Sequence, residues 1–275
     1  MAEINFTGKD VLSKFRLDNK IAIVTGSGHG IGEAIALAFA GAGAHVVIAA
    51  LHQESADETA KKVEALGMVA LPLEVDVTQG DQVPMMVERA ITKFGRIDIL
   101  VNNVGGPLKR RMSPLDMPED VWDAVIKLNL KSTFLCSKFV GRVMKNQNCG
   151  NIINIASGSG SRPYPDMIAY GVAKAGVINF TKTLSVCLAP YKIRVNCIAA
   201  GPTLTPGSAS AGTVQQRAER AGISLGRIAY TEDIALTSVY LASEAADFVT
   251  GELIDVLGGP IFGKTLLERA KQSWE

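Results

Sequence analysis

Short apolar runs rich in β-branched residues alternate with helical patterns along most of the chain, and this alternation most constrains the fold. Seven of these runs are almost continuously apolar, as strands buried on both faces of a sheet are. They cover residues 20–25, 45–50, 69–75, 97–102, 151–156, 193–199 and 252–257. Strands that alternate with helices form parallel βαβ units. The sequence therefore predicts a single α/β domain, a Rossmann-type doubly wound parallel sheet of about seven strands, flanked by helices on both faces.

The intervening segments carry helical periodicity and set the expected domain limits. Helices are predicted over 31–42, 54–66, a segment ending at Phe94, 119–145, 168–189 and 231–242. Residues 1–19 are expected to be an N-terminal extension, residues 20–262 the folded domain, and residues 263–275 a C-terminal tail. Within the domain, the irregular segment 202–226 is rich in Gly, Ser, Ala, Thr and Pro, which is typical of a substrate-binding loop.

Composition excludes several classes of protein. The chain is 47% hydrophobic and 20% charged, with a net charge of +1 and no basic stripe, so no nucleic-acid partner is expected. The N-terminus lacks a signal-peptide core and no apolar run reaches the length of a membrane span, which predicts a cytoplasmic protein without a membrane partner. The four cysteines form no CxxC pair and are expected to be buried, reduced thiols. The three histidines lack ligand spacing, so no metal site is predicted.

A glycine-rich turn from Thr25 to Gly32 follows the first predicted strand and leads into a helix. Gly26 permits a tight turn, Gly30 lets a pyrophosphate approach the backbone, and Gly32 allows the helix to pack closely on the strand. The helix N-terminus then offers unpaired N–H groups to the phosphates. A glycine-rich turn alone is a weak signal, but its place between a strand and a helix predicts a dinucleotide site.

The end of the second strand bears on the choice of dinucleotide. An acidic residue there usually holds the ribose hydroxyls of NAD. This chain has Ala50 and Leu51 at that place, so repulsion against a 2′-phosphate is removed, and His29 and His52 could lie near such a phosphate. No Arg or Lys stands there. The pattern favours NADP(H) over NAD(H).

Tyr170 and Lys174 lie four residues apart and therefore share one face of a predicted helix. A free tyrosine has a pKa of about 10, and a nearby ammonium group favours its phenolate. Tyr170 thereby becomes a usable proton donor and acceptor. The pair alone is common by chance, but Ser157 follows a predicted strand and precedes Tyr170 by thirteen residues. These three residues are the predicted catalytic group.

Taken together and in this order, the motifs resemble the short-chain dehydrogenase/reductase family from about Lys20 to Gly259. The further elements that carry the resemblance are Asp76 with Val77, Asn102 to Gly105, Asn129 in KLNLKS, and Asn196 with Gly201 in RVNCIAAG. Two residues depart from the family pattern: Val104 stands where Ala is commoner, and Ala200 stands where Pro often precedes the glycine.

The resemblance implies a role for each catalytic residue. Tyr170 passes a proton to or from the substrate oxygen, Ser157 hydrogen-bonds that oxygen, and Lys174 holds the nicotinamide ribose. Asn129 positions a water that links Lys174 to solvent. The cofactor-binding residues implied are Gly26, Ser27, His29, Gly30, Ile31, Leu51, His52, Asp76, Val77, Asn103, Gly105, Tyr170, Lys174, Gly201, Thr203 and Thr205.

The implied function is an NAD(P)-dependent oxidoreductase that interconverts a secondary alcohol and a ketone, assembled as a homotetramer or a dimer. The loop 202–226 has no Arg or Lys before Arg217 that could obviously clamp a carboxylate. Tyr164, Met167 and Ile168 suggest a moderately apolar pocket. A small neutral or apolar substrate is therefore expected. Two alternatives remain on the same fold: a dinucleotide-sensing regulator without catalysis, and an epimerase or lyase without net change of the nicotinamide.

Overall fold

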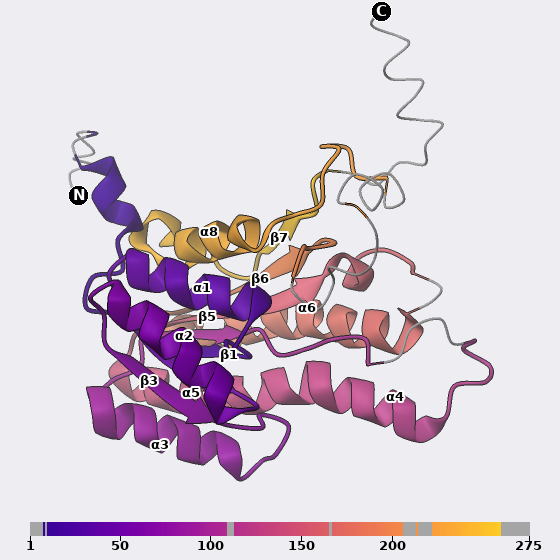
Figure 1. The fold of residues 1–275 in the computed structure, drawn as a ribbon, viewed down its shortest axis with the longest axis horizontal. Coiled ribbons are helices and arrows are strands. Elements are labelled where there is room, and N and C mark those ends of the chain that lie inside the picture. The colour runs from indigo at the N-terminus through magenta and orange to yellow at the C-terminus, as the bar shows by residue number, and fades with distance from the viewer. Residues whose placement is uncertain are drawn as a thin grey trace, which may run out of the picture.

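The computed structural model describes residues 8, 10–108, 113–164, 167–205, 213 and 222–259. Seven parallel strands form one sheet in the order β3-β2-β1-β4-β5-β6-β7 (Figure 1). The strands are β1 (Ile21–Thr25), β2 (His45–Ala50), β3 (Ala70–Glu74), β4 (Ile99–Asn102), β5 (Gly150–Ser157), β6 (Ile193–Ala200) and β7 (Leu253–Val256). Each overlaps a predicted run, so the expected seven-stranded parallel sheet is confirmed.

Helices connect the strands at nearly the predicted places. They are α1 (Gly30–Gly41), α2 (Gln53–Ala65), α3 (Gln82–Phe94), α4 (Glu119–Ile126), α5 (Ser132–Gln147), α6 (Ile168–Leu188) and α8 (Thr231–Ala242). The single helix predicted over 119–145 is wrong in one respect, because a turn of π-helix at Lys127–Lys131 separates α4 from α5. Such turns occur often at functional sites. Among the described helices, none is long and apolar enough to cross a membrane.

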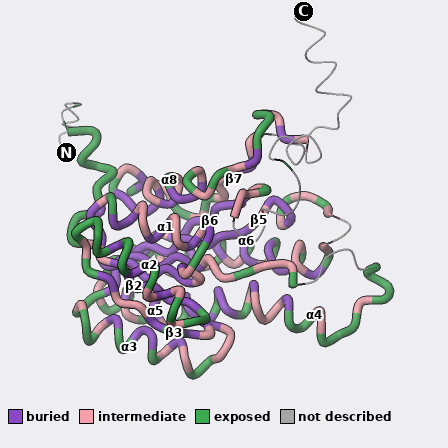
Figure 2. Tube along the Cα trace, in the orientation of Figure 1, coloured by how far each residue is buried: buried purple, intermediate pink, exposed green. Residues whose placement is uncertain are grey.

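The helices cover both faces of the sheet and the core lies between the layers (Figure 2). On one face, α1, α2 and α8 contribute Phe39, Val63 and Ile234 to a single hydrophobic cluster. On the other face, α3 and α5 pack against the sheet, and α6 covers β5 and β6. Alternate residues of β1 join the two clusters: Val24 lies in the first and Ile23 in the second. This two-sided burial explains why the strands read as continuous apolar runs.

Part of the segment before residue 20 already belongs to the hydrophobic core. After a short 3₁₀ helix at Val11–Phe15, Leu17 is fully buried in the first cluster, and its amide donates a hydrogen bond to the Ala42 carbonyl (2.8 Å). The last residues of the predicted extension 1–19 are therefore part of the domain. Of the predicted loop 202–226, residues 206–212 and 214–221 lie outside the described residues, as does the whole predicted tail 263–275.

The four cysteines are free thiols, but they do not share one environment. Cys136 and Cys197 are buried, whereas Cys149 and Cys187 are exposed. The expectation of buried thiols is thus wrong for two of the four. Cys149 follows the end of α5 and Cys187 lies on the outer face of α6, and periodicity alone did not separate these positions from core positions.

Candidate active site

The glycine-rich turn after β1 is held between β2 and β4. Gly26 has a φ of +65°, which favours glycine, and its amide donates a hydrogen bond to the Ala49 carbonyl (2.7 Å). A side chain at Gly32 would overlap the Gly26 carbonyl, so α1 can approach the strand only with glycine there. From the end of β4, the Asn103 Nδ2 donates to the carbonyls of Thr25 (3.0 Å) and Gly26 (3.1 Å). The turn is therefore fixed by backbone contacts on both sides.

The residues inside the turn open helix α1. Gly30, its first residue, has a φ of +65°, and the exposed His29 occupies the N-cap position without a side-chain hydrogen bond to the helix. Ser27 is buried, and its hydroxyl donates to the Val24 carbonyl (2.7 Å). Ile31 is half-buried and packs against the core. The first amides of α1 have no partner within the helix and are the predicted site for a pyrophosphate.

Gly28 is a residue that the sequence reasoning missed. A Cβ there would overlap the Ser55 hydroxyl and lie 3.1 Å from the Cβ of Ala50, so the turn is packed directly on the first turn of α2. The only signal in the sequence was a glycine that the motif left unexplained. Leu51, which follows β2, is 59% exposed, and His52 is the N-cap residue of α2. These residues border the turn on the side where the cofactor ribose is expected.

Asp76 lies just beyond the end of β3, where the sequence predicts contact with adenine. Its carboxylate accepts hydrogen bonds from the Thr78 amide (2.9 Å) and the Gln79 Nε2 (3.1 Å). Partial burial would raise the pKa of Asp76, but these hydrogen bonds outweigh it and hold the pKa below its ordinary value. The carboxylate is therefore charged at neutral pH and can accept a further hydrogen bond. Val77, beside it, is buried.

Tyr170 and Lys174 lie one turn apart in α6. The Lys174 Nζ donates a hydrogen bond to the Ile155 carbonyl (2.8 Å) and lies 5.7 Å from the centroid of the Tyr170 ring. Lys174 is 3% exposed, and burial lowers its pKa to about 8. A pKa near 8 leaves the amine mostly protonated at neutral pH. The predicted tyrosine–lysine pair thus carries a buried positive charge beside the phenol.

Ser157, the last residue of β5, is brought to α6 by the turn that follows it. The Ser157 hydroxyl accepts a hydrogen bond from the Ser159 amide (3.3 Å). A Cβ at Gly160 would lie 2.7 Å from the carbonyl carbon of Lys174, and a Cβ at Gly171 would lie 3.0 Å from the Ser159 carbonyl oxygen. Close backbone packing therefore sets Ser157 against the helix that carries the other two predicted catalytic residues. Gly160 was also missed from the sequence.

Asn129 is completely buried in the π turn between α4 and α5. Its Nδ2 donates to the carbonyls of Gly106 (3.0 Å) and Val125 (2.9 Å), and its Oδ1 accepts from the Gly106 amide (2.9 Å). A Cβ at Gly105 would lie 2.5 Å from that Oδ1 and 2.8 Å from the Lys174 Nζ. The side chain of Asn129 therefore clamps the loop after β4 next to Lys174. Its predicted role in holding a water stays a prediction.

The segment after β6 lies beside the glycine turn. The Thr203 hydroxyl donates to the Gly201 carbonyl (2.9 Å), and Thr203 forms an isolated parallel bridge with Ala229. A Cβ at Gly30 would lie 3.5 Å from the Thr205 Cγ2. Predicted cofactor residues from β1 to β6 thus gather along the carboxyl edge of the sheet. The strand order reverses between β1 and β4, and ligands of doubly wound sheets bind at such a reversal.

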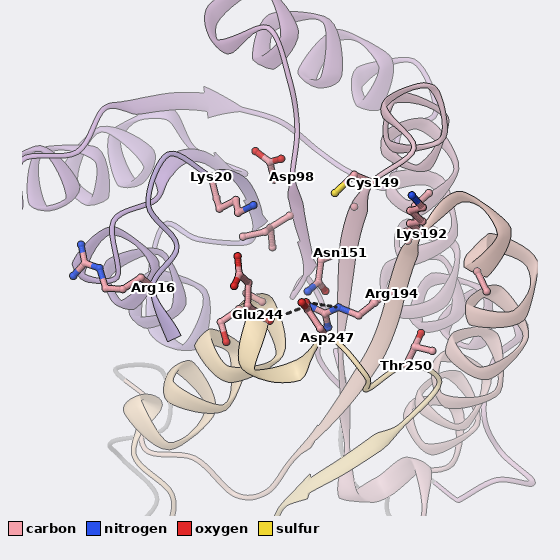
Figure 3. Close-up of a pocket in the computed structure, with 16 residues that line it drawn as sticks. Arg16, Lys20, Asp98, Cys149, Asn151, Lys192, Arg194, Glu244, Asp247 and Thr250 are labelled. Carbon is pink, nitrogen blue, oxygen red and sulfur yellow. Dashed lines mark hydrogen bonds and ion pairs between the residues drawn. The ribbon is translucent and has the colours of Figure 1, made fainter. Parts of the chain in front are cut away.

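One cavity lies beside the carboxyl edge of the sheet, and another lies at the opposite, amino edge. A cavity of about 660 Å³ between α1 and α8 includes Gly30 and Thr205 in its wall, so it adjoins the glycine turn. A second, of about 400 Å³, lies at the amino ends of β4, β5 and β6, away from the predicted catalytic residues (Figure 3). The acids in its wall are held by basic side chains: Asp98 by Arg96, Glu244 by Lys14, and Asp247 by Arg194. These ion pairs link the end of α8 and the start of the sheet to neighbouring segments.

Residues 26–260 match a family model described as enoyl-(acyl carrier protein) reductase. Together with the relatives below, this match shows that the chain belongs to the short-chain dehydrogenase/reductase family, as the motifs predicted. Among the described residues, no three His, Cys, Asp or Glu side chains are grouped to hold a metal ion.

The relatives are reductases and dehydrogenases that align over nearly their whole length. The 3-oxoacyl-[acyl-carrier-protein] reductase FabG of Thermotoga maritima is 38% identical over 244 residues, which are 89% of this chain and 98% of the relative. The NAD-dependent glycerol dehydrogenase of Listeria innocua is 34% identical over 258 residues, 93% of this chain and 98% of the relative.

A solved structure is equally similar. A 7α-hydroxysteroid dehydrogenase complexed with NADH and 7-oxo glycochenodeoxycholic acid superposes with a TM-score of 0.85 at 33% identity, covering 91% of this chain and 97% of that one. The predicted class, an NAD(P)-dependent oxidoreductase acting on CH–OH groups, is thereby confirmed.

Proposed function

We propose that this enzyme reduces the carbonyl of a small, neutral or apolar substrate, or oxidises the matching secondary alcohol, at the carboxyl edge of the sheet. The observation that carries the proposal is the meeting of Ser157, Tyr170 and a buried Lys174 beside the glycine turn. A pure dinucleotide sensor has no need of all three residues. An epimerase or lyase would use them without net change of the nicotinamide.

The turn and helix α1 fit a dinucleotide. Glycine at positions 28 and 30 leaves the backbone without side chains facing α2 and Thr205, and the N-terminus of α1 offers unpaired amides. The charged Asp76 lies at the end of the same edge and can accept a hydrogen bond from an adenine amino group. The bound nicotinamide would supply or accept the hydride.

The chain's own residues handle the proton and the substrate oxygen. In the reductive direction, Tyr170 gives its phenolic proton to the oxygen that gains charge, while Ser157 donates a hydrogen bond to that oxygen. The Lys174 ammonium stabilises the phenolate left behind, because it lies 5.7 Å from the ring centroid in a buried site. Gly105 lies against the Lys174 amine, and Asn129 holds the loop after β4 there through its hydrogen bonds to Gly106.

The preference between cofactors rests on the end of β2. Ala50 and the exposed Leu51 place no charge against a 2′-phosphate, which supports NADP(H). The relatives differ on this point, since one is named as NAD-dependent and one solved structure contains NADH. Affinities for NADPH and NADH, measured by nicotinamide fluorescence, decide between the two forms.

The named substrates of the relatives also differ: an acyl carrier protein thioester, glycerol and a bile acid. Our proposal of a neutral or apolar substrate rests on the residues around Ser157, including Tyr164 and Ile168, and not on those names. We likewise propose a homotetramer or a dimer, with a cytoplasmic location and no nucleic-acid partner.

The proposed reaction is tested by incubating the purified protein with NAD(P)H and a panel of ketones, following absorbance of the reduced nicotinamide. Tyr170→Phe should abolish turnover and leave cofactor affinity nearly unchanged. Tyr191→Phe is the matched control and should retain turnover, because Tyr191 lies in the 3₁₀ turn after α6, with the Lys145 Nζ 4.6 Å from its ring centroid. Retained activity in Tyr170→Phe would refute the mechanism, and dinucleotide binding without turnover of any substrate would favour a sensor.

A further inference from the structure

Glu74 supplies a carboxylate beside the position where the sequence lacks one. It is the last residue of β3, and in the parallel pairing of β2 with β3 its Cα lies opposite that of Ala50. Ala50 is the place at the end of β2 where an acid usually binds the cofactor ribose. Strand β2 therefore lacks the usual acid at its end, but the neighbouring strand β3 carries one, Glu74, at the position paired with Ala50. The two residues are far apart in sequence, so no motif connects them.

Two reciprocal hydrogen bonds join Glu74 to Gln53, one through the Glu74 carboxylate and one through its backbone amide. The Glu74 Oε2 accepts from the amide of Gln53, the first residue of α2 (3.1 Å), and the Glu74 amide donates to the Gln53 Oε1 (3.1 Å). The Gln53 Nε2 in turn donates to the Asp57 Oδ1 (2.8 Å). A carboxylate at a helix N-terminus is stabilised by the helix dipole. Glu74 is thus a fixed charge, and it occupies an amide that an incoming phosphate would otherwise use.

This charge belongs to the same surface as the glycine turn. Gly28 is packed against Ala50 and Ser55, and the Ser55 hydroxyl donates to the His52 carbonyl (2.9 Å). The turn, the end of β2, the first turn of α2 and Glu74 therefore form one continuous rim. With the pyrophosphate at the glycine turn as proposed, the ribose would lie at the end of β2, and a phosphate on its 2′-oxygen would lie toward the first turn of α2.

We propose that Glu74 is a specificity-determining residue that weakens binding of the 2′-phosphorylated dinucleotide. Its charge repels a phosphate dianion, whereas a free ribose hydroxyl can donate a hydrogen bond to a carboxylate. The inference rests on the proposed function, because it requires the dinucleotide to bind along the glycine turn. Glu74 therefore acts against the preference for NADP(H) that Ala50 and Leu51 favour.

The test is Glu74→Gln, which keeps the side-chain oxygen that accepts from Gln53 and removes the charge. Glu64→Gln is the matched control, because Glu64 is an exposed acid near the C-terminal end of the same helix, away from the rim. Dissociation constants for NADPH and NADH are measured for each protein by nicotinamide fluorescence. Glu74→Gln should tighten NADPH binding by about tenfold and change NADH binding by less than about twofold. Glu64→Gln should change the ratio of NADPH to NADH affinity by less than about twofold.

Salt gives an independent measurement of the same charge. Raising the ionic strength from about 0.05 M to about 0.5 M shortens the Debye length severalfold. Screening weakens the repulsion between Glu74 and the 2′-phosphate. The ratio of NADPH to NADH affinity should therefore rise more with salt in the wild type than in Glu74→Gln.

Equal ratios in the wild type and Glu74→Gln, or an equal shift in Glu64→Gln, would overturn the role of Glu74 and leave the proposed function intact. If neither dinucleotide bound to the wild type, the proposed function and this inference would both fail.

Discussion

Substitution of Lys174 by Met should change how the stability of the unliganded protein depends on pH. In the folded protein burial lowers the pKa of Lys174 to about 8 from 10.5. The unfolded chain keeps the higher value. Below pH 8 both states bind the proton, so folding must bury a charged amine. As pH rises from 8 to 10.5, the unfolded state binds more protons than the folded state, and stability contributed by this site rises.

The size of the effect follows from the two pKa values. Each unit of pKa difference corresponds to about 1.4 kcal/mol, so the shift from 10.5 to about 8 represents about 3 kcal/mol in full. Integrating the linkage relation from about pH 7 to about pH 10 gives about 2.5 kcal/mol, because the unfolded amine is still largely protonated at the upper limit. This dependence of stability on pH has the opposite sign to that of a lysine whose pKa is raised by an ion pair.

The assay is urea-induced unfolding of the wild type and Lys174→Met, without nucleotide, at several pH values across that range. Both proteins also carry Tyr170→Phe, because Lys174 interacts with that phenol. Groups that do not interact with Lys174 titrate equally in both proteins, so they cancel in the difference between the two free energies of unfolding. That difference should shift in favour of the wild type by about 2.5 kcal/mol as pH increases. A difference that stays flat, or that moves toward the variant, would show that Lys174 is not a buried amine with a lowered pKa.

Two further substitutions test how the site and the opposite edge are built. Gly105→Ala should lower turnover by at least about tenfold while the protein stays folded, because the new Cβ would meet the Asn129 Oδ1 at 2.5 Å and the Lys174 Nζ at 2.8 Å and displace the amine; steady-state kinetics with circular dichroism check this, and unchanged kcat would contradict it. Asp98→Ala should cost about 2 kcal/mol of stability, because the 5% exposed carboxylate accepts from the Ile21 amide (2.9 Å) and its loss leaves that amide without a partner, whereas the half-exposed Arg96 stays hydrated. Chemical denaturation measures the loss, and a value under about 1 kcal/mol would mean that water replaces the carboxylate.

Local patterns were enough to predict most of the elements. The strand β2 and the helix α8 begin and end where periodicity placed them, and the other strands differ by one or two residues. The glycine turn and the spacing of Ser157, Tyr170 and Lys174 also identified the family. These features are visible in one sequence because burial on two faces, helix periodicity and glycine-dependent turns each leave a short-range signature.

Features that depend on packing were not predictable in this way. The π turn at Lys127–Lys131 interrupts a helical pattern that continues smoothly through it, and Asn129 is buried there by its contacts with the loop after β4. Leu17 looked like part of an extension, yet it fills the core beneath Ala42. Gly28 is a glycine because the Ser55 side chain of α2 comes close to it, and Gly160 is a glycine because the backbone of α6 does.

The sequence by itself determined the strands, most helices, the glycine-rich turn and the spacing of the three proposed catalytic residues, because each is encoded by residues within a short stretch of chain. The tertiary structure decided that Lys174 is buried with a lowered pKa, that Asn129 clamps Gly106, and that Glu74 stands opposite Ala50. These facts arise from strand register and helix packing between residues distant in sequence. Burial and hydrogen bonding act through space, so a charge on β3 can affect a ligand site that the sequence assigns to β1 and β2.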